Sequence, residues 1–225
     1  MTTDGNMNRM RTVGVVQVTR KGDGSTPCKS NPRNDFVATE EPLQIRIESE
    51  AITTTMRTPD HDQELVAGFL YAEGIIDGPD DIHAMNHVGD TAEKRANTYN
   101  VVLSGGVPAG RRGRIRREMF SSSACGVCGT TSIAHLLENA GPIEHQLPVD
   151  PAVLCALPQR LRTAQAVFSQ TGGLHAAGLF HTDGTLQVVR EDIGRHNTVD
   201  KVIGWRLLQG NTPINDAILV VSGRT

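Results

Sequence analysis

The segment "VVREDIGRHNTVDKVIG" (residues 188–204) decides the fold class, because in it a β-strand runs directly into an α-helix. The pattern predicts that the strand ends at Val189 and that the helix begins near Asn197. Asn197 is a favourable N-cap residue, and Asp200 follows three residues later, like the acid of a capping box. In α/β proteins, ligands and above all phosphates bind where strands end and the next helices begin. The segment therefore predicts both α/β layering and a binding site.

The sequence around this segment repeats the alternation of strands and helices. A helical pattern covers residues 150–165 with a break at Pro158, a strand interrupted by two glycines covers 166–180, and another strand follows Ala217. Such alternation predicts helices layered around a mixed sheet.

The N-terminal half is predicted to be α+β. Strands are expected at 13–19, 43–49 and 99–105, with a loop at 21–35 that is rich in Gly, Pro and Ser. A helix is expected within 58–75, with Thr58 as its cap and Pro59 in its first turn. We therefore divide the chain into a flexible segment and loop (1–36), an α+β portion (37–109), and a CxxC loop with an α/β portion (110–225). Because the last strand is followed at once by "SGRT", we expect the C-terminal end to be truncated.

Composition excludes several classes of protein. Hydrophobic residues make up 38% and charged residues 21%, as in an ordinary soluble protein. The net charge of −3 gives no sign of nucleic-acid binding. We find neither a membrane span nor a signal peptide, so we expect a cytoplasmic protein that does not interact with membranes. In a reducing cytoplasm the four cysteines need not form disulfides.

The stretch "SSSACGVCG" (121–129) places Cys125 and Cys128 two residues apart. A zinc site would need a second Cys or His pair, which the sequence lacks. A thioredoxin-type dithiol would start a long helix after a first strand, whereas this pair lies in mid-chain, with a helix predicted from about Thr131. The Ser and Gly neighbours and the start of that helix favour a reactive thiolate, which could carry sulfur as a persulfide. A zinc site, a redox pair and two inert buried cysteines remain alternatives.

A second cluster predicts an anion site. Arg190, Asp192, Arg195 and His196 fill the junction between the strand and the helix, and arginine can hold two phosphate oxygens at once. Glycines in "TGGLHAAGLF" (171–180) let backbone approach a ligand closely. The alternatives are a salt-bridged surface turn and, for His175, a core histidine.

These motifs resemble the FdhD/NarQ family. The resemblance rests on "EEPLQIRI", "MRTPDHDQELVAGFLYAEGII", the CxxC loop, "TGGLHAAGLF", "VREDIGRHNTVDKVIG" and "VVSGRT", and it covers roughly residues 40–225. It implies an accessory sulfurtransferase that takes sulfur from a cysteine desulfurase. The sulfur goes to the molybdenum or tungsten bis-molybdopterin guanine dinucleotide cofactor, as formate dehydrogenase activity requires.

The resemblance also implies roles for residues. Cys125 would carry the persulfide and Cys128 would assist it. We assign the bound cofactor, as substrate, to the two clusters and the terminal arginine: Gly172, Gly173, His175, Arg190, Asp192, Arg195, His196, Asn197, Asp200, Lys201 and Arg224. We expect no permanently bound metal. Rival functions are a non-catalytic chaperone for the cofactor and a zinc or redox CxxC module.

The fold implied by the resemblance is a three-layer α/β/α sandwich with a mixed sheet, similar to cytidine deaminases. Deamination is not expected, because a zinc deaminase needs H-x-E ahead of its CxxC pair. In this sequence the CxxC pair comes first, and Ala177 replaces the glutamate. Members of the family tend to form homodimers, although no stretch here identifies an interface.

Overall fold

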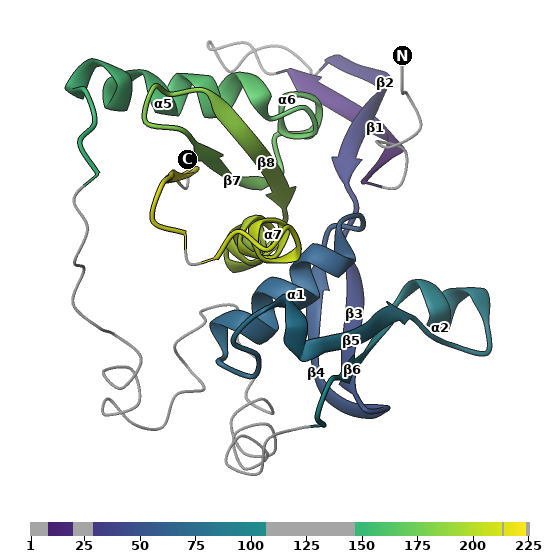
Figure 1. Cartoon of the computed structure of the whole chain (residues 1–225). Coiled ribbons are helices and arrows are strands. Elements are labelled where there is room, and N and C mark those ends of the chain that lie inside the picture. The colour runs from purple at the N-terminus through teal and green to yellow at the C-terminus, as the bar shows by residue number, and fades with distance from the viewer. Residues whose placement is uncertain (1–8, 20–28, 107–146, 213, 224–225) are drawn as a thin grey trace, which may run out of the picture.

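The computed structural model describes residues 9–19, 29–106, 147–212 and 214–223, which form a mixed α/β protein (Figure 1). Strands β1 (Met10–Thr19) and β2 (Lys29–Ala38) pair as an antiparallel ribbon. A four-stranded sheet has the order β4-β3-β6-β5, and a three-stranded sheet has the order β8-β7-β9. The mixed α/β class predicted from the sequence is confirmed.

The four-stranded sheet packs against helix α1 (Asp62–Ala72). Its strands are β3 (Glu41–Ile47), β4 (Glu50–Arg57), β5 (Ile82–His87) and β6 (Thr98–Leu103), with η1 (Pro79–Asp81) and α2 (Ala92–Ala96) between them. Strands β3 and β6 are parallel and the other neighbours antiparallel, so this sheet is mixed. Every second residue of β3 is buried, as its alternating sequence predicts: Leu43, Ile45 and Ile47.

The three-stranded sheet lies between two helices. Its strands are β7 (His175–Phe180), β8 (Leu186–Asp192) and β9 (Ile218–Val221), and the helices are α5 (Pro151–Ala164) and α7 (Arg195–Leu208). Ala176 and Phe180 on β7 pack with residues of α5, whereas Ala177 and Leu179 pack with Val202 of α7. This part of the protein is therefore an α/β/α sandwich, and its described strands pair antiparallel.

Helix α7 joins the two halves, because it lies between the three-stranded sheet and α1 (Figure 1). The two helices touch through glycines. A Cβ atom added to Gly68 would lie 1.9 Å from the carbonyl oxygen of Asp200, and one added to Gly204 would lie 1.8 Å from that of Glu64. Only glycine lets the two backbones approach so closely.

Two N-terminal predictions are wrong in part. The loop predicted at 21–35 becomes strand β2 from Lys29 onward. Residues 36 and 37, between which we divide the chain, both lie in β2, and the division itself stays a prediction. Continuous pairing with β1 outweighs the loop-like composition, and Pro32 is tolerated because, among the described strands, β2 pairs only with β1. Thr58 does not cap α1, which begins at Asp62 after His61 in the left-handed conformation.

Three predictions in the second half also need correction. Helix α5 runs through Pro158 without a break. The strand predicted at 166–180 begins only at His175, because a short helix, α6 (Phe168–Thr171), comes first and ends at Gly172 with a φ of 66°. Strand β8 continues to Asp192 rather than ending at Val189.

The predicted cap of α7 is wrong as well. The helix begins at Arg195 after Gly194, so Asn197 and Asp200 lie inside it and not at a capping box. Asn197 forms contacts with another part of the fold instead.

Candidate functional site

A buried carboxylate, Asp192, lies at the junction between β8 and α7. Its Oδ2 accepts hydrogen bonds from Lys201 Nζ at 2.7 Å and from the backbone N–H of Thr58 at 3.1 Å. Its Oδ1 accepts from the Gly194 N–H and from Asn197 Nδ2, both at 2.8 Å. Four donors therefore compensate a negative charge that is fully removed from solvent.

The same network ties α7 to the end of β4. Lys201 Nζ donates to the carbonyl oxygen of Thr58 at 2.9 Å, and Asn197 Nδ2 donates to that of Met56 at 2.8 Å. The hydroxyl of Thr58 accepts from the Ile193 N–H at 3.1 Å. The structure thus gives Asp192, Asn197 and Lys201 a structural role, while their predicted contact with a cofactor stays a prediction.

Arg190, which we predict to bind phosphate, holds a carboxylate of this chain, and its contact with a cofactor stays a prediction. Its Nε lies 2.5 Å from Glu64 Oε2 and its second terminal nitrogen 2.6 Å from Oε1, so the pair is bidentate. The two residues are 126 positions apart and lie on β8 and α1. Sequence reasoning missed Glu64, because nothing local to it signals so distant a partner.

The first turn of α7 remains available to an anion. Gly194 provides no side-chain cap to the helix. Arg195 is half-buried, and no hydrogen bond or ion pair joins its side chain to another residue in the ranges that the structure covers. A helix start and an uncommitted guanidinium both favour negative charge.

The other predicted site residues lie at several places in the fold or outside the described ranges. His175 is half-buried and pairs in register with Asp192, whereas His196, Gly172 and Gly173 are exposed. Asp200 is half-buried at the crossing of α7 with α1. Three predicted residues lie outside the described ranges, namely Cys125, Cys128 and Arg224, so their place in the site stays a prediction.

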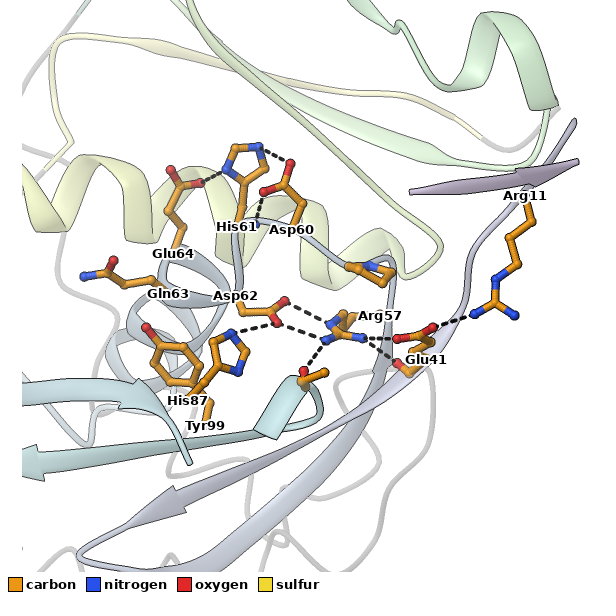
Figure 2. A pocket seen from close by; sticks show the side chains of 12 residues that line it. Arg11, Glu41, Arg57, Asp60, His61, Asp62, Gln63, Glu64, His87 and Tyr99 are labelled. Atoms are coloured by element: carbon orange, nitrogen blue, oxygen red, sulfur yellow. Dashed lines mark hydrogen bonds and ion pairs between the residues drawn. The ribbon is translucent and has the colours of Figure 1, made fainter. Parts of the chain in front are cut away.

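A second polar region, which sequence reasoning missed, is a pocket of about 670 Å³ at the start of α1 (Figure 2). Its wall includes Asp60 and His61, whose φ angles of 91° and 60° are unusual for residues other than glycine. Such backbone strain persists only where the surrounding structure enforces it, and it concentrates at functional sites. The density of titratable residues in "PDHD" (59–62) is the sequence signal that could have indicated this pocket.

An ion pair at the base of the pocket orders its side chains. Arg57 and Asp62 are 2% and 7% exposed and form two hydrogen bonds of 2.9 and 3.0 Å. His87 Nε2 lies 3.5 Å from Asp62 Oδ2. The rings of His87 and Tyr99 pack edge to face, with their centroids 4.6 Å apart. Burial, helped by the negative charge of Asp62, raises the pKa of Tyr99 to about 12. Tyr99 is thus a neutral hydrogen-bonding group at any physiological pH.

The described residues contain no group of three or more His, Cys, Asp or Glu side chains that could hold a metal ion. The expected lack of a permanent metal stays a prediction. Among the helices described, none is long and apolar enough to cross a membrane.

The fold and its two polar regions define a mixed α/β protein with a buried ionic junction between its halves. The model of the FdhD/NarQ family matches residues 38–225. The chain is 48% identical over 216 residues to the sulfur carrier protein FdhD of Corynebacterium efficiens, covering 93% of this chain and 78% of the relative. It is 46% identical over 220 residues to that of Mycolicibacterium paratuberculosis, covering 93% and 79%. The chain therefore belongs to the FdhD/NarQ family.

A solved structure supports the fold. A formate dehydrogenase accessory protein from Desulfotalea psychrophila matches with a TM-score of 0.65 and 22% identity, over 94% of this chain and 75% of that one. At 22% identity the match shows only that the two proteins share a fold.

Proposed function

We propose that this protein is a cytoplasmic sulfurtransferase. It accepts persulfide sulfur on Cys125 from a cysteine desulfurase and delivers it to the bis-molybdopterin guanine dinucleotide cofactor of formate dehydrogenase. The observation that carries this proposal is the family match over residues 38–225, which includes the CxxC loop, to relatives named sulfur carrier proteins.

The chemistry needs one thiolate and no external oxidant in the first step. The Cys125 thiolate attacks the terminal sulfur of the desulfurase persulfide, so that one S–S bond forms on Cys125 while the donor's S–S bond breaks and its thiolate leaves. In the second step the S–S bond on Cys125 breaks and the thiolate is regenerated. The reduced metal of the substrate cofactor supplies two electrons and takes the sulfur as a sulfide ligand. Cys128 assists by keeping Cys125 reactive.

The substrate's phosphates suit the start of α7. A guanine dinucleotide carries pyrophosphate, which matches the helix start without a side-chain cap at Gly194 and the guanidinium of Arg195, which has no partner within the described ranges. Gly172 and Gly173 are exposed and carry no side chain, so such a ligand can approach the backbone closely. Their N–H groups donate within the chain, to the Phe168 carbonyl oxygen at 2.7 Å and to Thr171 Oγ1 at 3.3 Å. Arg190 and Lys201 are paired with Glu64 and Asp192 and also donate to backbone carbonyls, so a contact of either with the phosphates would have to compete with these partners.

The test is the intact mass of the protein after incubation with a cysteine desulfurase and L-cysteine. We expect a gain of whole sulfur atoms that reductant removes and that Cys125→Ala abolishes. Because Cys155 is a free, exposed thiol, Cys155→Ser is the matched control, and this variant must keep the full gain. Sulfur uptake that survives Cys125→Ala, or a Cys125–Cys128 disulfide with no uptake, would refute the carrier role.

A cofactor chaperone without sulfur chemistry predicts a different result. In that case Cys125→Ala would still support full activation of formate dehydrogenase, and only changes near Arg195 would reduce it.

A further inference from the structure

Glu191 is a buried carboxylate that the function proposed above does not use; its side chain is 3% exposed. It lies between Arg190 and Asp192 on β8, but side chains alternate along a strand, so Glu191 points to the opposite face of the sheet. Its register partner Ala176 packs with α5, whereas Asp192 contacts residues of α7. Glu191 therefore serves a different part of the fold from its two neighbours.

The carboxylate of Glu191 fixes the start of α6. Its Oε2 accepts the Val167 N–H at 3.0 Å, and its Oε1 accepts the Phe168 N–H at 2.7 Å. The first N–H groups of a helix have no partner within the helix, and a negative charge is favourable beside them. A helix of four residues is not stable by itself, so the position of α6 depends on contacts of this kind.

The N-terminal ribbon packs against the same region. Arg9, just before β1, donates from Nη2 to the Glu191 carbonyl oxygen at 3.3 Å, and this nitrogen lies 3.7 Å from Glu191 Oε2. At the end of β2, the Cβ atom of Ala38 lies 3.6 Å from the position that a Cβ atom of residue 173 would take. The ribbon and Glu191 together hold α6 and the glycines that follow it.

The turn that ends α6 lies beside the start of α7. Strand β7 runs antiparallel to β8, with His175 opposite Asp192. Continued by two residues, this register brings Gly173 opposite Gly194, the residue before α7. The glycine turn and Arg195 therefore lie at the same end of the three-stranded sheet. This is where the function proposed above requires the phosphates of the substrate to bind.

We propose that Glu191 is a positioning residue for the substrate: through α6 it holds the turn of Gly172 and Gly173 in place beside the start of α7. The inference rests on the function proposed above, because the place of the turn matters only if phosphates bind next to it. A turn that is already fixed spares the ligand the cost of ordering it, and so strengthens binding.

The test is calorimetric titration of the full chain with GDP and, separately, with guanosine, which lacks phosphates. Glu191→Gln keeps the size of the side chain but replaces one acceptor oxygen by an NH₂ group, which cannot accept an N–H. GDP binding should weaken about tenfold, because the ligand must then order the turn. Guanosine binding should change far less. Glu191→Asp, which keeps the charge but shortens the side chain, is judged by the same criteria and decides the matter if Glu191→Gln does not fold.

Gly173→Ala tests the turn directly. An added Cβ atom would meet its neighbours only at ordinary contact distances of 3.6 Å or more, so this variant should fold normally. Its methyl group should still weaken GDP binding, because it stands on the backbone that the phosphates approach.

Asp62→Asn is the matched control for Glu191→Gln. Asp62 is also a buried carboxylate at the start of a helix, and it also lies beside an arginine, Arg57. Circular dichroism establishes that each variant is folded at the temperature of the titration.

Selective loss of GDP affinity in Glu191→Gln and Gly173→Ala, with Asp62→Asn like the parent, would support the proposal. It is overturned if either of the first two variants binds GDP like the parent, or if Glu191→Gln loses GDP and guanosine affinity equally, as a merely structural role predicts. A parent protein that does not bind GDP overturns both this inference and the cofactor site. If sulfur uptake on Cys125 fails while GDP binding behaves as expected, the carrier function is refuted and this inference still stands.

Discussion

Lys201 Nζ lies 2.7 Å from Asp192 Oδ2, and both side chains are completely buried between the two halves of the protein. A buried ion pair contributes little net stability when it is intact, but removal of one partner leaves a charge without compensation. We therefore expect that substitution of one partner weakens the junction between α7 and the turn from β4 to α1.

Lys201→Met should lower the free energy of unfolding by about 3–5 kcal/mol, because it leaves the Asp192 carboxylate buried without its cation. Urea unfolding followed by circular dichroism measures this. Lys94→Met is the matched control: Lys94 forms an ion pair with Asp90 at 3.0 Å, but both side chains are exposed. Its loss should change stability far less. Equal effects of the two substitutions would show that the Asp192–Lys201 pair does not hold the junction.

Gly204→Ala should lower the free energy of unfolding by about 1–3 kcal/mol or more. The new methyl group would lie 1.8 Å from the carbonyl oxygen of Glu64 and would force α7 away from α1. Thermal unfolding measures the loss. Gly14→Ala in β1 is the control, since a Cβ atom there meets nothing within 4 Å. A Gly204→Ala variant as stable as the Gly14→Ala variant would contradict the close helix crossing.

Asp200→Asn should stabilise the protein above neutral pH. Burial, followed by the charges of Glu73 and Asp192, raises the pKa of Asp200 from 3.8 to about 7. Between about pH 4 and pH 7 the native state therefore binds more protons than the unfolded state, and the contribution of Asp200 to stability falls as the pH rises. The variant lacks this loss, so its advantage in the free energy of unfolding should grow across that window and then level off. The rise of the pKa from 3.8 to about 7 sets an upper limit of roughly 4 kcal/mol on this advantage.

Denaturant midpoints at a series of pH values check this expectation. Asp90→Asn is the contrasting variant, because the pKa shift of Asp90 has the opposite direction: the hydrogen bond from Lys94 lowers the pKa of Asp90. That variant should gain nothing as the pH rises. An Asp200→Asn curve parallel to that of the parent would show that Asp200 ionises normally in the folded protein.

Arg195→Ala should weaken binding of GDP about tenfold, because Arg195 is the guanidinium placed at the start of α7 without a partner among the described residues. Binding of guanosine, which lacks phosphates, should change much less. Titrations of both ligands are compared with those of Arg33→Ala, whose side chain pairs with Asp35 on the exposed face of β2. Unchanged GDP affinity would remove Arg195 from the anion site.

Local sequence patterns predicted much of the fold. The alternation of apolar and polar residues in β3 and the run of strand and helix around residues 188–204 correspond to observed elements. Helix starts were predicted less well. Thr58 and Asn197 have side chains typical of N-caps, but both serve contacts between the two halves instead. A pattern of a few residues cannot reveal such a use, because the competing partner is more than 130 positions away.

The sequence alone determined the mixed α/β class, the family and the segment around residues 188–204 as a dense polar junction, since these depend on hydrophobic periodicity and on motifs contiguous in the chain. Only the tertiary structure decided what the polar residues do. It placed Glu64 against Arg190, buried Asp192 with Lys201, and left Arg195 without an anionic partner among the described residues. The physical reason is that the environment of a charge depends on the groups that packing brings around it, and these groups come from distant parts of the chain.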